Sequence, residues 1–245
     1  MRGGDARGQG PFWPAEVSVK LLGGFDLRRR GDSVAVPLAA QRLAAFLALK
    51  DHWQPRSLVA GMLWSDTTEE RAAASLRSAL WRLREPGLPL IESASDRMRL
   101  APHVAVDVRE ARAVARRLID PTNDSEDTDL SDELLSVDLL PGWDDAWLLI
   151  ESQRFHQLRL HALEALCERL TVARKYAEAV EVGLLAISGD QLRESAHRVL
   201  IEAYLAEGNT VEAIRQYRSY RMVAEEFRAE PTPLMERLLT RLSLV

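Results

Sequence analysis

The residues best suited to chemistry in this sequence are four arginines between positions 71 and 84, with no acidic residue among them. Guanidinium groups read guanine through paired hydrogen bonds and also neutralise phosphates. Small residues between them let a helix approach a surface closely. We therefore expect a helix in the major groove of DNA, with contacts from Arg71, Ser75, Arg77, Ser78, Arg82 and Arg84. A solvated amphipathic helix with ordinary surface arginines is the alternative.

Two further arginines, Arg97 and Arg99, follow on a predicted hairpin. Basic residues on the wing of a DNA-binding domain contact phosphate or the minor groove. The alternative is an edge hairpin whose charges oppose aggregation.

Groups suited to catalysis are sparse. Cys167 is the only cysteine and shares an apolar stripe with leucines, which predicts a buried small side chain and excludes an internal disulfide. The closest histidines, His156 and His161, are five residues apart, whereas a helical metal pair needs a spacing of four. Phosphate-loop, dinucleotide and serine-hydrolase glycine motifs are absent from the sequence. We expect no catalytic residue, no metal and no cofactor, and hence a protein that is not an enzyme.

The elements that position the arginines are predicted by periodicity. Period-two alternation favours strands at residues 17–21, 25–28 and 33–36, separated by glycine turns. Pro37 opens a helix with an apolar face formed by Leu38, Leu43, Phe46, Leu47 and Leu49. A second helix spans residues 57–64 and is capped by Ser57.

The third helix carries the arginines. Thr67 and Glu70 form a capping-box pattern, the helix extends over about residues 68–84, and Pro86-Gly87 stops it. Helical spacing places Ala73, Leu76, Leu80 and Leu83 against the core. Arg71, Ser75, Ser78 and Arg82 are then on the opposite face, with Arg77 and Arg84 on the flanks. Strands at 90–92 and 98–100 complete the order of an α+β winged helix-turn-helix.

The second half of the sequence is predicted to be helical. Asp107 and Glu110 cap a helix that ends near Ile119, and half of residues 120–133 are acidic, which is typical of a solvated loop. Residues 175–180 align with 209–214 at an offset of 34, the period of tetratricopeptide repeats. Two such repeats need capping faces, which a long helix at 144–174 and a terminal helix at 233–244 would supply. Trp143 and Trp147 fit core positions at helical spacing.

Charge divides the chain in the same way. Residues 1–120 hold 19 basic against 14 acidic side chains, and residues 121–245 hold 13 against 23. A basic front half favours a polyanionic partner. There is neither a secretory signal nor an apolar run long enough to cross a membrane, so we expect a cytoplasmic, nucleoid-associated protein without a membrane partner.

Two segments carry a specific resemblance. LVAGMLWSDTTEERAAASLRSALWRLR, followed by LPLIESASDRMRL, resembles the winged helix of the antibiotic regulatory protein family of actinomycete transcriptional activators. LLPGWDDAWLLIESQRFHQLRLHALEAL, with KYAEAV and EEFRAEPTPLMERL, is similar to the bacterial transcriptional activator domain paired with it. The family's hairpin often has a Gly-rich turn ending in Gly-Tyr, which this chain replaces with residues 93–98.

The resemblance implies an OmpR-like domain that binds direct repeats in double-stranded promoter DNA near the −35 element, as a homodimer, and recruits RNA polymerase holoenzyme to a biosynthetic gene cluster. The loop before the third helix would face polymerase; it consists of Trp64, Ser65, Asp66, Thr67, Thr68, Glu69 and Glu70. We expect a disordered arm at 1–15, the winged helix at 16–105 and a helical, tetratricopeptide-like domain at 106–245. Neither an ATPase module nor a receiver domain is expected.

A different class of function also fits. A tetratricopeptide-like interaction adaptor would keep the helical repeats while its winged helix no longer binds DNA. The arginine face of the third helix argues against this alternative.

Overall fold

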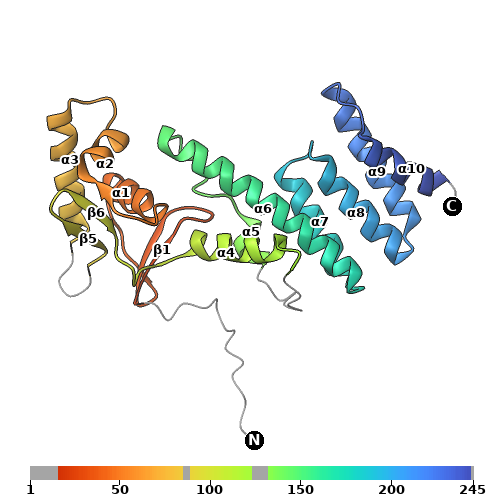
Figure 1. The fold of residues 1–245 in the computed structure, drawn as a ribbon, viewed down its shortest axis with the longest axis horizontal. Coiled ribbons are helices and arrows are strands. Elements are labelled where there is room, and N and C mark those ends of the chain that lie inside the picture. Colours follow the sequence, from red (N-terminus) through yellow and green to blue (C-terminus); the bar gives the residue numbers. More distant parts are fainter. Residues whose placement is uncertain (1–15, 85–88, 123–131, 244–245) are drawn as a thin grey trace, which may run out of the picture. The chain divides into compact units, whose positions relative to one another are not determined.

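The computed structural model describes residues 16–84, 89–122 and 132–243 (Figure 1). The predicted arm at 1–15, the turn at Pro86-Gly87 and most of the acidic loop at 120–133 lie outside these residues. The chain forms two compact units. The first takes the residues up to Val108 together with Leu140–Leu148, and the second takes Arg109–Leu139 and the residues from Leu149 onward.

A four-stranded sheet of order β3-β2-β1-β7 begins the first unit. Its strands are β1 (Val17–Lys20), β2 (Asp26–Arg29), β3 (Asp32–Ser33) and β7 (Ala105–Val106). Gly23 and Gly24 both have positive φ, which gives the β1–β2 connection the backbone freedom of glycine. The third strand is shorter than predicted, although Val34 still donates its amide hydrogen to the Leu27 carbonyl at 2.7 Å.

Helices α1 (Leu38–Ala48), α2 (Arg56–Leu63) and α3 (Glu69–Arg82) follow. The apolar face predicted for α1 is buried except for Leu38, which is 62% exposed at the first turn. Ser57 does not cap α2. That helix starts directly after Pro55, and the Arg56 amide donates to the Asp96 carbonyl of the hairpin turn at 2.7 Å.

The predicted hairpin is present as β5 (Ile91–Ala94) and β6 (Arg97–Leu100), and β4 (Gln54–Pro55) extends it to a three-stranded sheet of order β4-β6-β5. The strands, three helices and hairpin together form the predicted winged helix-turn-helix (Figure 1).

Residues 140–148 pack on the first unit, although the sequence places them with the helical part. The Leu140 amide donates to the Leu21 carbonyl at 2.8 Å, and Asp145 forms an ion pair with Arg42. The Trp147 ring meets the Phe46 ring edge-on, with 5.4 Å between centroids, and is 7% exposed. Asp107 joins this unit too. Its carboxylate accepts amide hydrogens from Leu21, at 2.9 Å, and from its own helix, and no hydrogen bond to it from Glu110 is present among the described residues.

The second unit is helical throughout the described residues, apart from its connections. Its helices are α4 (Asp107–Ile119), α5 (Asp132–Ser136), α6 (Ala146–Val172), α7 (Tyr176–Gly189), α8 (Glu194–Glu207), α9 (Thr210–Glu226) and α10 (Pro233–Ser243). The first residues of α4 and α6, up to Val108 and Leu148, belong to the first unit. Helices α7 and α9 begin 34 residues apart, and the equivalent alanines Ala179 and Ala213 are both fully buried. The predicted repeat of paired helices is therefore confirmed.

Candidate nucleic-acid interface

Helix α3 starts one residue later than the capping box predicts. The side chain of Thr68 caps the helix by accepting the Arg71 amide hydrogen at 3.4 Å. The Thr67 hydroxyl instead donates to the Trp64 carbonyl at 3.2 Å and tightens the loop before the helix. Glu69 and Glu70 occupy the first turn, where negative charge complements the helix dipole.

The buried face of α3 consists of Ala72, Leu76, Ala79 and Leu83, whereas Ala73 and Leu80 are only partly buried. The predicted stripe is therefore right at Leu76 and Leu83 and wrong at the other two positions. Alanines in the core let α3 pack closely on its neighbours. A prediction from hydrophobicity alone favours leucine over alanine at such positions. At 100° per residue, the mean direction of the observed buried face differs by about 50° from that of the predicted stripe.

This rotation decides which polar residues point outward. Arg71, Arg77, Ser78, Arg82 and Arg84 are exposed, and Ser75 is half-buried. Arg77 and Ser78 now lie farther from the buried face than Arg71 and Arg82 do. None of the four guanidinium groups of α3 and its C-terminal end forms an ion pair with a described residue. The Arg82 guanidinium lies 4.9 Å from the ring centroid of Trp81, which is 65% exposed.

The two wing arginines differ. Arg99 is opposite Glu92 in the β5–β6 register, and its Nε donates to Oε2 of that residue at 2.8 Å. Its guanidinium also lies 4.6 Å from the ring centroid of Trp53. Arg97 is exposed beside the turn, and its nearest carboxylate oxygen, on Asp96, is 3.9 Å away. Arg97 is therefore much more available to an external partner than Arg99.

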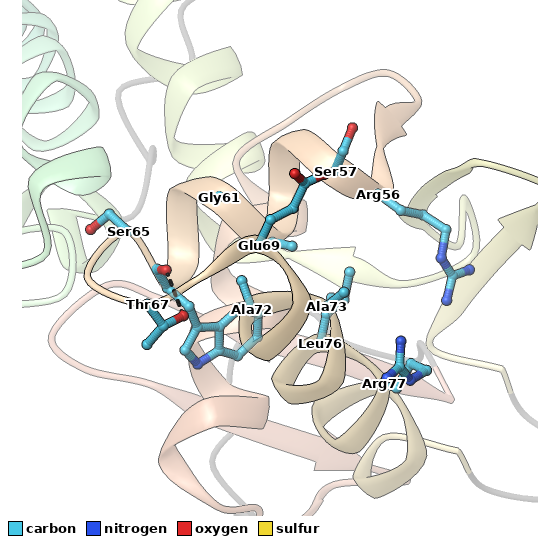
Figure 2. A pocket seen from close by; sticks show the side chains of 12 residues that line it. Arg56, Ser57, Gly61, Ser65, Thr67, Glu69, Ala72, Ala73, Leu76 and Arg77 are labelled. Carbon is cyan, nitrogen blue, oxygen red and sulfur yellow. Dashed lines mark hydrogen bonds between the residues drawn. The ribbon is translucent and has the colours of Figure 1, made fainter.

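The loop predicted to face polymerase is exposed from Ser65 to Glu70, and Trp64 is half-buried. Between α2, this loop and α3 lies an open cavity of about 540 Å³ (Figure 2). Arg56 at the start of α2 and Arg77 on α3 line the same side of it. Sequence reasoning missed Arg56, although the first helix of a helix-turn-helix pair crosses the DNA backbone and a basic residue at its start fits that role.

Cys167 and His197 are among the buried titratable side chains of the second unit. The Cys167 thiol donates to the Ala179 carbonyl at 3.2 Å, and burial raises its pKa to about 12, which confirms the predicted inert side chain. Burial lowers the pKa of His197, whose Nδ1 accepts from the Gln216 amide at 2.8 Å while Nε2 lies 3.0 Å from the Gln191 carbonyl. Both groups are therefore engaged by hydrogen bonds inside the helical unit.

Comparison with known proteins agrees with this architecture. Residues 128–242 match the family described as the bacterial transcriptional activator domain. A structure of Mycobacterium tuberculosis EmbR in complex with a low-affinity phosphopeptide is similar over 93% of this chain, with a TM-score of 0.73 and 18% sequence identity. This chain covers 65% of that protein. No curated protein sequence matches the chain.

No helix among the described residues has the length and apolar character that crossing a membrane requires. The winged helix and the tetratricopeptide-like helices stand in the order that the sequence predicts. Residues 128–242 are similar to a bacterial transcriptional activator domain, and a winged helix-turn-helix precedes them in the part of the chain that the structure describes.

Proposed function

We propose that this chain is a sequence-specific DNA-binding transcriptional activator. In this proposal α3 enters the major groove of promoter DNA, and the loop from Trp64 to Glu70 contacts RNA polymerase holoenzyme. The observation that carries it is the exposed arginine face of α3, whose guanidinium groups form no ion pair with the residues that the structure describes. A cluster of like charges without internal partners repels itself, and phosphates relieve that repulsion.

The observed buried face of α3 decides which role we propose for each arginine. With Ala72 and Ala79 in the core, Arg77 points farther outward than Arg82 and becomes the first candidate for reading a base edge. Arg71 and Arg82 flank it on one side, and Arg84 follows the helix end. In this proposal Arg56 and Arg97 contact phosphates, whereas Arg99 supports the wing through its hydrogen bond to Glu92.

The resemblance supports a finer proposal on the target. Two copies of the chain would occupy two direct repeats near a −35 element, upstream of a biosynthetic gene cluster. The match of residues 128–242 to an activator domain supports a role in transcription over that of an adaptor that has lost DNA binding.

A salt titration distinguishes the two functions. Full-length protein is titrated by fluorescence anisotropy on its own upstream DNA between 50 and 200 mM salt. Because phosphate contacts release counterions, a DNA-binding protein with several of them loses about 10³-fold or more in affinity over this range. An adaptor shows no binding at 50 mM salt, and that result would refute the proposal.

A further inference from the structure

The cavity between α2 and α3 has the size and walls of a small-molecule site. Its volume of about 540 Å³ lies within the range of roughly 300–1,000 Å³ that is usual for such sites. Ala73 and Leu76 line it from α3, Gly61 from α2, and Trp64 from the loop (Figure 2). Trp64 is half-buried and contributes an aromatic side chain to the lining of the cavity.

Charge at one side of the cavity specifies the ligand further. The side chains of Arg56 and Arg77 lie on the same side of it, away from Ser65 and Thr67 (Figure 2). Neither guanidinium forms a hydrogen bond or an ion pair with a described residue. Glu69 is the one carboxylate among the lining residues, and it precedes Arg77 by eight positions, about 12 Å along the helix. The arginine side therefore favours an anion, and the rest of the cavity an apolar group.

We propose that this cavity binds a small aromatic carboxylate. Its carboxylate accepts hydrogen bonds from Arg56 and Arg77, and its ring packs against Ala73, Leu76 and Trp64. Arginine pairs bind carboxylates with directional, charge-assisted hydrogen bonds, which set the orientation of the ring.

Such a ligand would also regulate the protein, and this step rests on the proposed function. Arg77 lies on the DNA-facing side of α3, so one guanidinium would have to serve both the ligand and the DNA. Binding of either lowers the affinity for the other by the same factor. The ligand would therefore act as a negative effector of DNA binding.

Calorimetry on the full chain without DNA tests the site, with 2-naphthoate as the probe and the neutral 2-naphthamide as its matched control. We expect 2-naphthoate to bind with one site per chain, and 2-naphthamide at least tenfold more weakly. Arg56→Gln should weaken 2-naphthoate at least tenfold. Arg84→Gln removes the same charge from an exposed position outside the cavity and should leave its affinity within twofold.

A cavity-filling variant tests the location. A side chain at Gly61 would meet no atom within 4 Å of its Cβ, and the position does not require a positive φ. Gly61→Leu should therefore fold normally, with an unchanged melting temperature, and bind no 2-naphthoate. Absence of 2-naphthoate binding to the wild type, equal weakening by Arg56→Gln and Arg84→Gln, or full binding by a folded Gly61→Leu variant would overturn the site.

Competition tests the regulatory step. Saturating 2-naphthoate should raise the apparent Kd for promoter DNA at least fivefold in the wild type and leave it unchanged in Gly61→Leu. An unchanged Kd in the wild type refutes the competition. If the wild type binds 2-naphthoate but no DNA at low salt, the proposed function fails and the site stands. If the wild type binds DNA but no 2-naphthoate, the site fails and the proposed function stands.

Discussion

Arginine serves different purposes in the helical unit and along helix α3 of the first unit. In the helical unit several arginines are tied to carboxylates, as in the pairs Arg112–Glu151 at 3.0 Å, Arg159–Asp138 at 2.8 Å, Arg193–Glu164 at 2.6 Å and Arg221–Glu225 at 2.8 Å. The three arginines of α3, and Arg84 just after it, have no such partner among the described residues. Arginines paired with carboxylates stabilise the helical unit, either between its segments or within one helix, whereas the unpaired arginines of α3 are available to a molecule outside the chain. The predictions below test this contrast.

The largest effect is expected from charge placed in the helical core. Ala179→Arg and Ala213→Arg each bury an unpaired guanidinium at an equivalent position of the repeat, where both alanines are fully buried. Each should cost several kcal/mol and unfold or loosen the second unit. Thermal and urea melts measure it, with Val211→Arg as the control because Val211 is 59% exposed. Unchanged melts of both core variants would contradict the expectation that these two alanines pack in the helical core.

A comparable loss of stability is expected in the first unit when the packing of residues 140–148 on it is weakened. Trp147→Ala removes a buried ring that packs edge-on against Phe46 and should cost about 3–5 kcal/mol. Trp81→Ala removes the same side chain from an exposed position and should change stability by less than about 0.5 kcal/mol. Urea melts compare the two. Equal stabilities would show that residues 140–148 contribute nothing to this unit.

The unpaired arginines should matter for DNA rather than for stability. Arg77→Ala should reduce the ratio of specific to random DNA affinity by about 1–3 kcal/mol, because a base contact is lost. Arg84→Ala should lower both affinities, keep the ratio and reduce the salt slope by about one. Competition titrations at one salt concentration decide it. If Arg82→Ala reduces the ratio and Arg77→Ala does not, the sequence-based orientation of the helix is the better one.

The smallest effect concerns pH in the helical unit. Both ring nitrogens of His197 are engaged in its neutral form, and burial lowers its pKa from the usual 6.5. The neutral form is favoured in the folded state, so its stabilisation is complete above pH 6.5 and is lost as pH falls below that value. Urea melts at pH 7.5 and 5.5 should show a loss of up to about 1.4 kcal/mol.

The variants His197→Gln and His161→Gln distinguish the effect of the His197 imidazole from that of the other titratable groups. His197→Gln should lose less stability between the two pH values than the wild type, because Gln does not titrate. His161 is exposed, so His161→Gln should behave as the wild type does. An identical pH dependence for all three proteins would exclude His197 as the origin.

The order of elements was predictable because periodicity and turn residues act locally. Period-two strands, the Thr-rich start of α3 and the 34-residue spacing all reappear in the fold. The predictions that differ from the structure concern features that depend on tertiary packing. Alanine at 72 and 79 is buried because neighbouring helices come close, and Asp107 binds a distant strand end instead of Glu110. The cavity and the role of Arg56 follow from how α2 and α3 pack, which no local pattern reveals.

The return of residues 140–148 has a consequence for the order of events during synthesis. The first unit lacks Trp147, Asp145 and the Leu140 amide until the ribosome has passed Leu148. Its folding therefore cannot finish while only the amino-terminal 105 residues have emerged, although domains usually fold one after another from the amino terminus. A chimera that grafts this winged helix onto another regulator has to bring 140–148 with it, because cutting at the apparent boundary leaves behind a piece of its core.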